Sequence, residues 1–212
     1  LIVGSLFGRW DSGSEIPTLD DEILAFDHST TSATNLFSKA LDELFQEPEV
    51  AERELESTLG DRPITWSRER FFRYHHVDEY KPRGERSPIY WQLESPNGGF
   101  SCFVYYNEID ENTLPKLRGQ YLDPRIGELE NELETLNAQT SGDNPDKELL
   151  SRKEEIQNDL EDVREFRETI DGMIDDGVTV DVEKGIWENI KEWDQYEVLE
   201  TGLPKLKSSY SR

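Results

Sequence analysis

The segment from Arg86 to Glu108, RSPIYWQLESPNGGFSCFVYYNE, is the part of this chain around which the other elements are expected to pack. Apolar residues alternate with their neighbours before and after Pro96-Asn97-Gly98-Gly99, which predicts a β-hairpin. The Asn-Gly pair supplies the positive φ angles that a tight turn requires. A two-stranded hairpin is not stable alone in water, so helices from both flanks are expected to cover it. One face of the predicted hairpin carries Ile89, Trp91, Leu93, Phe100, Cys102, Val104 and Tyr106, and the other carries Tyr90, Phe103 and Tyr105.

The periodicity of the remaining sequence predicts an α+β fold that is mainly helical. Stretches on both sides of the hairpin repeat apolar residues at the spacing of an amphipathic helix. We therefore expect a small antiparallel β-hairpin sheet packed by helices, with residues 1–112 forming this core module. Within it, helices are expected over residues 32–47, 48–59 and 67–80, the last one capped by Ser67, and a loop is expected over residues 11–31.

Residues 113–175 are expected to form a protruding arm, an antiparallel two-helix coiled coil. Leucine and isoleucine recur at heptad-like spacing in two stretches, and the polar loop from Thr140 to Pro145 reverses the chain between them. Pro124 is expected to kink or break the first stretch. Residues 176–203 are expected to return to the core as a short strand containing Val178, Val180 and Val182, followed by a short helix, and residues 204–212 are expected to form a flexible tail.

The net charge of −24 is large for a chain of 212 residues. Such a surface repels itself at low salt, whereas at molar salt the Debye length falls to about 3 Å and most of this repulsion disappears. We interpret the chain as salt-adapted and of haloarchaeal type, with an ordinary acidic surface that favours solubility as the alternative.

The lone Cys102 is typical of a reducing compartment, and no apolar run approaches the roughly 18 residues of a membrane span. We therefore expect a cytoplasmic protein without membrane contact. Because the chain opens at Leu1 in mid-pattern, we interpret it as a fragment of a longer polypeptide.

One stretch, from Arg62 to Arg86, is basic, with seven arginines and lysines against four acidic residues. Arginine interleaved with aromatic residues is the usual composition of a surface that contacts phosphates and bases. Two interpretations remain open: the basic side chains pair with carboxylates of the same chain while the aromatics fill the core, or the stretch binds nucleic acid and the aromatics stack on bases. His75 and His76 are adjacent and point about 100° apart on a helix, so no metal site is expected there. The candidate nucleic-acid-binding residues are Arg68, Arg70, Arg73, His75, Lys81, Arg83, Arg86, Tyr90 and Trp91.

Four segments of the chain resemble one family in the same order. RSPIYW, from Arg86 to Trp91, resembles the R-x-P-I-Y-W stretch of adenine-specific DNA methyltransferases of the phage-exclusion (BREX or Pgl) type, which are relatives of fused type IIG restriction–modification enzymes. The resemblance spans nearly the whole chain and implies the C-terminal portion of such an enzyme, after its catalytic domain. Asp181 stands where the family often has Asn. The other matching segments are VGSLFGRWD from Val3 to Asp11, TLPKLRGQY from Thr113 to Tyr121, and DDGVTVDV from Asp175 to Val182.

The chain lacks the motifs that the family's reaction needs, a glycine-rich cofactor loop after a strand and an N-P-P-Y motif that receives the flipped adenine. We therefore expect no catalytic residues and no cofactor in this chain, and the resemblance implies S-adenosylmethionine for the full-length enzyme only. The expected function is that of a non-catalytic module that helps to recognise or clasp double-stranded DNA, with the upstream methyltransferase domain of the same polypeptide as its other partner. The alternatives are a protein-interaction module, whose coiled-coil arm docks another subunit of the defence complex, and a free-standing remnant of a disrupted gene.

Overall fold

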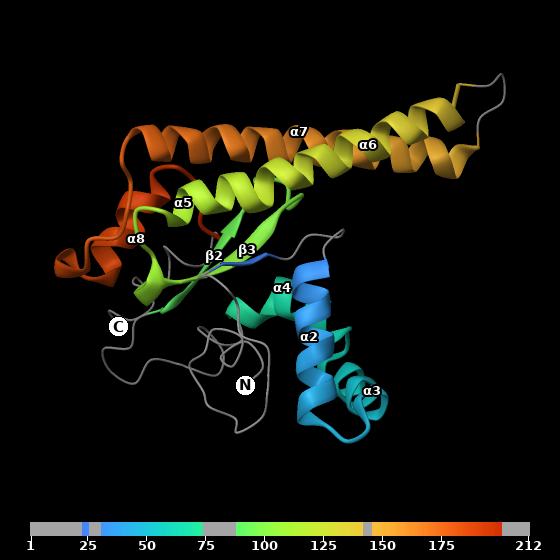
Figure 1. Ribbon diagram of the computed structural model, residues 1–212, viewed down its shortest axis with the longest axis horizontal. Coiled ribbons are helices and arrows are strands. Elements are labelled where there is room, and N and C mark those ends of the chain that lie inside the picture. Colours follow the sequence, from blue (N-terminus) through green and yellow to red (C-terminus); the bar gives the residue numbers. More distant parts are fainter. Residues whose placement is uncertain (1–22, 26–30, 74–87, 142–145, 201–212) are drawn as a thin grey trace.

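A computed structural model of the chain describes residues 23–25, 31–73, 88–141 and 146–200, with the side chains of 31–35, 72 and 73 left undescribed. The fold is mainly helical, with a small three-stranded antiparallel sheet packed between helices (Figure 1). This confirms the predicted fold class. The N-terminal part of the chain, residues 1–22, and the predicted tail over 204–212 lie outside the described residues.

The predicted hairpin forms strands β2 (Tyr90–Glu94) and β3 (Ser101–Tyr105). Its turn contains Gly98 at φ 78°, the left-handed conformation that glycine adopts without strain, whereas Asn97 has no positive φ, so only the glycine of the predicted Asn-Gly pair behaves as expected. A third strand, β1 (Ile23–Ala25), pairs antiparallel with β3, so the strand order is β1-β3-β2. The prediction of a loop over 11–31 missed this strand. Its three residues are too few to show an alternating pattern, and pairing with a strand almost 80 positions later defines it.

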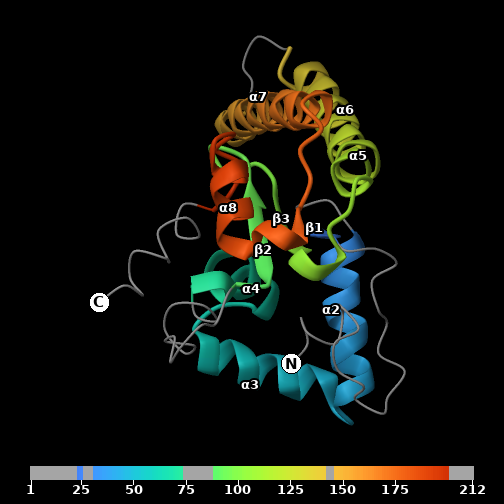
Figure 2. The ribbon, with the colours of Figure 1, turned by 90° about the vertical axis from the view of Figure 1, so that its left-hand side faces the viewer.

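Helices cover both faces of the sheet (Figure 2). On one face, Phe71 meets Phe103 and Tyr90 at ring-centroid distances of 5.4 and 6.3 Å. On the opposite face, Trp91 meets Trp193 at 5.3 Å in an edge-to-face arrangement. The two predicted faces of the hairpin are therefore confirmed, and both are buried.

Three helices precede the hairpin: α2 (Thr31–Leu44), α3 (Pro48–Leu59) and α4 (Pro63–Arg73). Pro48 opens α3, and Gly60 ends it in the left-handed conformation, both as predicted. α4 begins four residues earlier than expected, because Pro63 starts the helix, and Ser67 is a buried residue inside it rather than its cap. The predicted continuation of this helix past Arg73 lies outside the described residues.

The arm consists of α5 (Thr113–Lys116), a π-helical segment over Leu117–Leu122, α6 (Asp123–Gln139) and α7 (Lys147–Asp175). Pro124 does not break it: the proline occupies the first turn of α6, and the wide π turn before it keeps the chain helical. α6 and α7 lie side by side and project beyond the sheet (Figure 1). Ion pairs such as Arg152–Glu132, 2.9 Å, join their exposed edges. The buried apolar residues of the two helices include Leu129, Leu136, Ile156, Leu160 and Val163.

After α7 the chain returns to the sheet. The predicted strand over 178–182 is wrong: residues 178–181 form no strand, and Val182–Lys184 form a 3-10 turn. The predicted short helix is α8 (Ile186–Asp194). Residues 198–200 then lie along the outer edge of β2, where Glu94 N donates to Val198 O (3.0 Å) and Leu199 forms an isolated bridge with Leu93. Over the described ranges, no helix has the length and apolar character needed to cross a membrane.

Candidate nucleic-acid interface and the anchored turn

Four of the nine predicted interface residues have described side chains. Arg68 and Arg70 lie on α4, and Tyr90 and Trp91 open β2. Arg73 ends α4, but its side chain is outside the description, as are His75, Lys81, Arg83 and Arg86 altogether. The basic stretch therefore begins on α4 and ends shortly before β2, and its residues 74–86 lie outside the described ranges.

Tyr90 and Trp91 are core residues, with exposed fractions of 2% and 0%. The ring of Trp91 is covered by Tyr106 (5.1 Å) and Trp193, and its Nε1 donates to Pro88 O at 3.1 Å. The ring of Tyr90 lies 5.5 Å from that of Tyr105. A base cannot stack on these rings while the core is closed, so we assign both residues to packing.

The two arginines on α4 differ in their surroundings. Arg68 is half-buried, and its Nη2 donates to the carbonyl oxygen of Gly98 in the hairpin turn. Its backbone carbonyl accepts from Gln92 Nε2 at 3.0 Å, so α4 is held to β2 at this point. Arg70 is exposed. Arg68 is therefore engaged within the chain, at a backbone carbonyl, and Arg70 lies at the surface.

The turn between β2 and β3 is held by a carboxylate from the arm. Asp162 of α7 is 2% exposed and accepts hydrogen bonds from two backbone N–H groups of the turn, Asn97 N and Gly99 N, each at 2.8 Å. It also accepts from Ser95 Oγ (2.5 Å) and Asn97 Nδ2 (3.0 Å). Four donors compensate for the loss of water around the buried charge. We call Asp162 the anchor aspartate and residues 95–100 the anchored turn.

Gly99 makes this approach possible. A Cβ at this position would lie 2.9 Å from Asp162 Oδ2 and 3.3 Å from Asp159 O. Sequence reasoning missed the anchor aspartate because acidic residues are abundant. The signal that marks it is its place beside the buried positions Leu160 and Val163 of α7, where a carboxylate requires partners.

A second carboxylate lies at the same end of the hairpin. Glu94 ends β2, and burial raises its pKa, as do the negative charges of Glu200 and the anchor aspartate, whereas Arg68 lowers it. The electrostatic environment of the anchored turn is therefore negative, with Arg68 providing part of the compensating charge.

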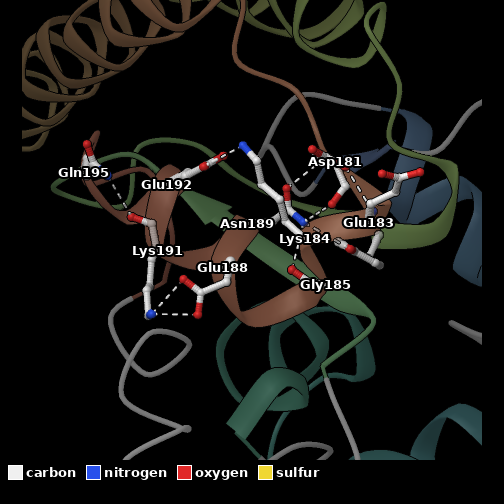
Figure 3. A network of polar contacts seen from close by, with 10 residues as sticks. Asp181, Glu183, Lys184, Gly185, Glu188, Asn189, Lys191, Glu192 and Gln195 are labelled. Atoms are coloured by element: carbon white, nitrogen blue, oxygen red, sulfur yellow. Dashed lines mark hydrogen bonds and ion pairs between the residues drawn. The ribbon is translucent and has the colours of Figure 1, made fainter.

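The segment after the arm is organised by Asn189 of α8, which is fully buried (Figure 3). Its Oδ1 accepts from Asp181 N at 2.8 Å, and its Nδ2 donates to Asp181 O (2.7 Å) and Gly185 O (2.9 Å). The same amide lies 3.3 Å from Tyr106 Oη, and burial raises the pKa of that phenol. One side chain thus fixes the 181–185 turn against the end of the hairpin.

The two buried polar side chains, of Asp162 and Asn189, act as structural supports. The anchor aspartate and Asn189 have their hydrogen-bonding capacity directed at backbone groups of the same chain. Within 23–25, 31–73, 88–141 and 146–200, no three His, Cys, Asp or Glu side chains are grouped as metal ligands. What this arrangement does is hold the hairpin, α4 and the arm in fixed relation, with Arg70 at the surface.

Comparison with known proteins gives one informative match. No family model matches the chain. The chain is similar to an adenine-specific methyltransferase, PglX, of Lacticaseibacillus casei (strain Zhang), with 25% identity over 202 residues. The match covers 86% of this chain and 16% of that protein, so the chain spans about a sixth of the relative's length. This similarity supports a relationship to adenine-specific methyltransferases, the coarser part of the resemblance found in the motifs.

Proposed function

We propose that this chain is a non-catalytic, C-terminal module of a DNA adenine methyltransferase of a phage-defence system, and that it helps the enzyme to hold double-stranded DNA. The observation that carries the proposal is the match to the methyltransferase, which extends over 86% of this chain but only 16% of the relative. A segment that is matched almost throughout and is so small a part of the relative fits a module of a larger enzyme. S-adenosylmethionine and the adenine-receiving motif would belong to the remainder of the enzyme, in the cytoplasm.

The DNA-contacting part of this module would be the basic stretch that α4 and β2 bracket. Both brackets are firmly held, α4 through the Arg68 contacts with the hairpin and β2 through its pairing with β3. Arg70, a residue of this stretch that lies on α4, is exposed. Rigid elements on either side position contacting side chains more accurately than a free loop does.

The test uses the full-length enzyme and the triple variant Arg70→Ala, Arg73→Ala and Arg83→Ala. Each lost phosphate contact reduces the slope of log affinity against log salt by about 0.9, so the slope is expected to fall by about 3. Affinity for DNA and site methylation are measured across a salt series that includes molar salt. A matched control replaces three arginines elsewhere, Arg53, Arg152 and Arg164, by Ala.

The DNA-holding role is refuted if the first triple variant retains the affinity, salt slope and methylation of the parent enzyme. It is also refuted if the control variant loses as much as the first, because the effect would then follow net charge and not position.

A second candidate function is that the arm docks another subunit of the defence complex. The observation that favours it is the projection of α6 and α7 beyond the sheet, with Leu150 42% exposed near their free end. Removing only residues 133–151 and joining the ends with a short glycine-rich loop keeps the Glu132–Arg152 pair and the anchor aspartate. Loss of a co-purifying subunit with DNA affinity unchanged would favour this function; the reverse result would favour the DNA role.

A further inference from the structure

The groove along α3, lined also by residues 45–47 that connect α2 to it, is a partly apolar surface that the proposed DNA role does not use. All twelve residues of α3 are described, and none of them is buried. Among the described residues, four large apolar side chains are exposed, and two of these, Phe45 (43%) and Val50 (36%), line this groove. Ala51 and Leu55 form the rest of its apolar lining, and its volume is about 430 Å³.

The lining of the groove has the geometry of a helix-packing surface. Val50, Ala51, Glu54, Leu55 and Thr58 follow the spacing i, i+1, i+4, i+5 and i+8, which places them in one stripe along α3. Eight residues of helix rise about 12 Å, the length of a contact between two crossing helices. The surface is therefore shaped for the apolar stripe of another helix.

The charge around the groove selects the occupant. Glu47 and Glu54 lie at its rim, and α3 as a whole carries four glutamates against one arginine. This rim repels the phosphates of nucleic acid and the headgroups of anionic lipid, and it repels the same rim of a second copy. Lysines or arginines that flank an apolar stripe would complement it.

We propose that the groove along α3 is a docking site for a basic amphipathic helix of a partner protein. Apolar side chains of that helix would contact Val50 and Leu55, and its basic side chains would pair with Glu47 and Glu54. This is the helix-in-groove mode of recognition. The groove shares no residue with the basic stretch or the arm, so the docking proposal can be tested separately from the DNA role.

The probe is a synthetic helix of about 18 residues, long enough to form in solution, with leucines at helical spacing and lysines beside them. Its acidic twin carries glutamates in place of the lysines. Binding to the intact chain is measured by calorimetry at about 0.15 M salt, where charges more than about 8 Å apart are largely screened. The lysine peptide is expected to bind and the acidic twin is not.

The double variant Phe45→Ser and Val50→Ser is expected to bind the lysine peptide at least about tenfold more weakly, because it removes apolar contacts at the centre of the groove. Leu150→Ser, at an equally exposed apolar residue of the arm, is the matched control and is expected to change nothing. Because Phe45 and Val50 are exposed, the double variant is expected to fold, and far-UV circular dichroism is used to check that its helix content equals that of the wild type.

Charge reversal gives a second readout that does not depend on apolar packing. Glu54→Lys is expected to weaken binding of the lysine peptide by about tenfold and to improve binding of the acidic twin, whereas Glu134→Lys on the exposed side of α6 is expected to do neither.

The proposal is overturned if the wild-type chain does not prefer the lysine peptide. It is also overturned if the groove variants bind as the wild type does, or if the arm controls lose as much as the groove variants. A dimer in sedimentation that Phe45→Ser dissociates would assign the groove to a second copy and would likewise overturn it.

Discussion

The anchor aspartate offers the sharpest test of how this fold is held together. Replacing Asp162 by Ala removes the acceptor of four hydrogen bonds that tie α7 to the anchored turn. The Ser95 hydroxyl has a second acceptor in Phe100 O at 3.2 Å, and the Asn97 side chain is partly exposed and turns to water. The backbone N–H of Asn97 lies at an exposed residue and can be hydrated in part, whereas that of Gly99 is buried and has no such replacement.

The magnitude follows from these two N–H groups. A buried donor left without a partner costs about 1–3 kcal/mol, and this applies to Gly99 N; Asn97 N belongs to an exposed residue and costs less, because water can replace the carboxylate. Removing a buried charge returns part of this, because the charge no longer has to be kept away from water. We expect Asp162→Ala to lower the free energy of unfolding by about 2 kcal/mol, equivalent to about 6 °C in Tm for a chain of this size.

Urea denaturation followed by tryptophan fluorescence measures the effect, with equal m-values required for the comparison. Asp162→Asn, which keeps the volume and one acceptor oxygen, is expected to cost less than the Ala variant. Glu161→Ala, at the adjacent exposed carboxylate, is the control and is expected to stay within about 0.5 kcal/mol of the wild type. If Asp162→Ala matches this control, the anchored turn is not what joins arm and sheet.

Three further outcomes are expected. Gly99→Ala places a Cβ 2.9 Å from the anchor carboxylate and is expected to lower the free energy of unfolding by about 1–3 kcal/mol in urea titrations. Gly172→Ala has no atom within 4 Å of its new Cβ and is expected to raise the free energy of unfolding by about 0.5 kcal/mol, because alanine favours a helix over glycine. The pKa of Glu94 is raised above 4.5 in the folded state, so just above pH 4.5 the folded chain binds more protons than the unfolded chain and loses stability as the pH rises. Glu94→Gln is expected to flatten this part of the curve of unfolding free energy against pH. An unchanged slope would contradict the direction of the pKa shift. Asn189→Ala removes three hydrogen bonds to the partly buried backbone of the 181–185 turn and is expected to lower the midpoint of thermal unfolding by about 6–9 °C. Gln195→Ala, at the exposed residue that follows α8, is expected to change it little.

The elements that the sequence predicted correctly are those whose own residues specify them. The hairpin carries its alternation and its Asn-Gly turn in one short stretch, and α3 carries both its opening Pro48 and its closing Gly60. The arm repeats its apolar residues over many turns, so α6 and α7 were identifiable without knowing what they contact.

The elements that the sequence misassigned depend on distant partners. β1 exists because Ile23 to Ala25 pair with β3. The alternating valines after α7 favour a strand, yet the hydrogen bonds of Asn189 hold residue 181 in a turn, and the edge of β2 is taken by residues 198–200 instead. Pattern alone does not indicate which of two short segments reaches a sheet edge.

The candidate site was predicted in outline only. Composition identified the basic stretch, but it did not separate Arg68, which contacts the turn, from Arg70, which is exposed. It also did not show whether Tyr90 and Trp91 face the core or a ligand, because the same aromatic residues suit both environments. The anchor aspartate is one of many acidic residues, and its four hydrogen-bond donors identify it in the structure.

The joining of α7 to the hairpin loop makes the two-helix projection a lever. About 23 Å of helix separates Asp162 from the first residue of α7. The helix is fixed at Asp162 by the backbone N–H groups of Asn97 and Gly99. A pull or twist applied at the far end is therefore transmitted to the loop that Arg68 also touches, and through it to α4. A partner bound at the free end of α6 and α7 would therefore affect the position of α4, which carries the first arginines of the basic stretch.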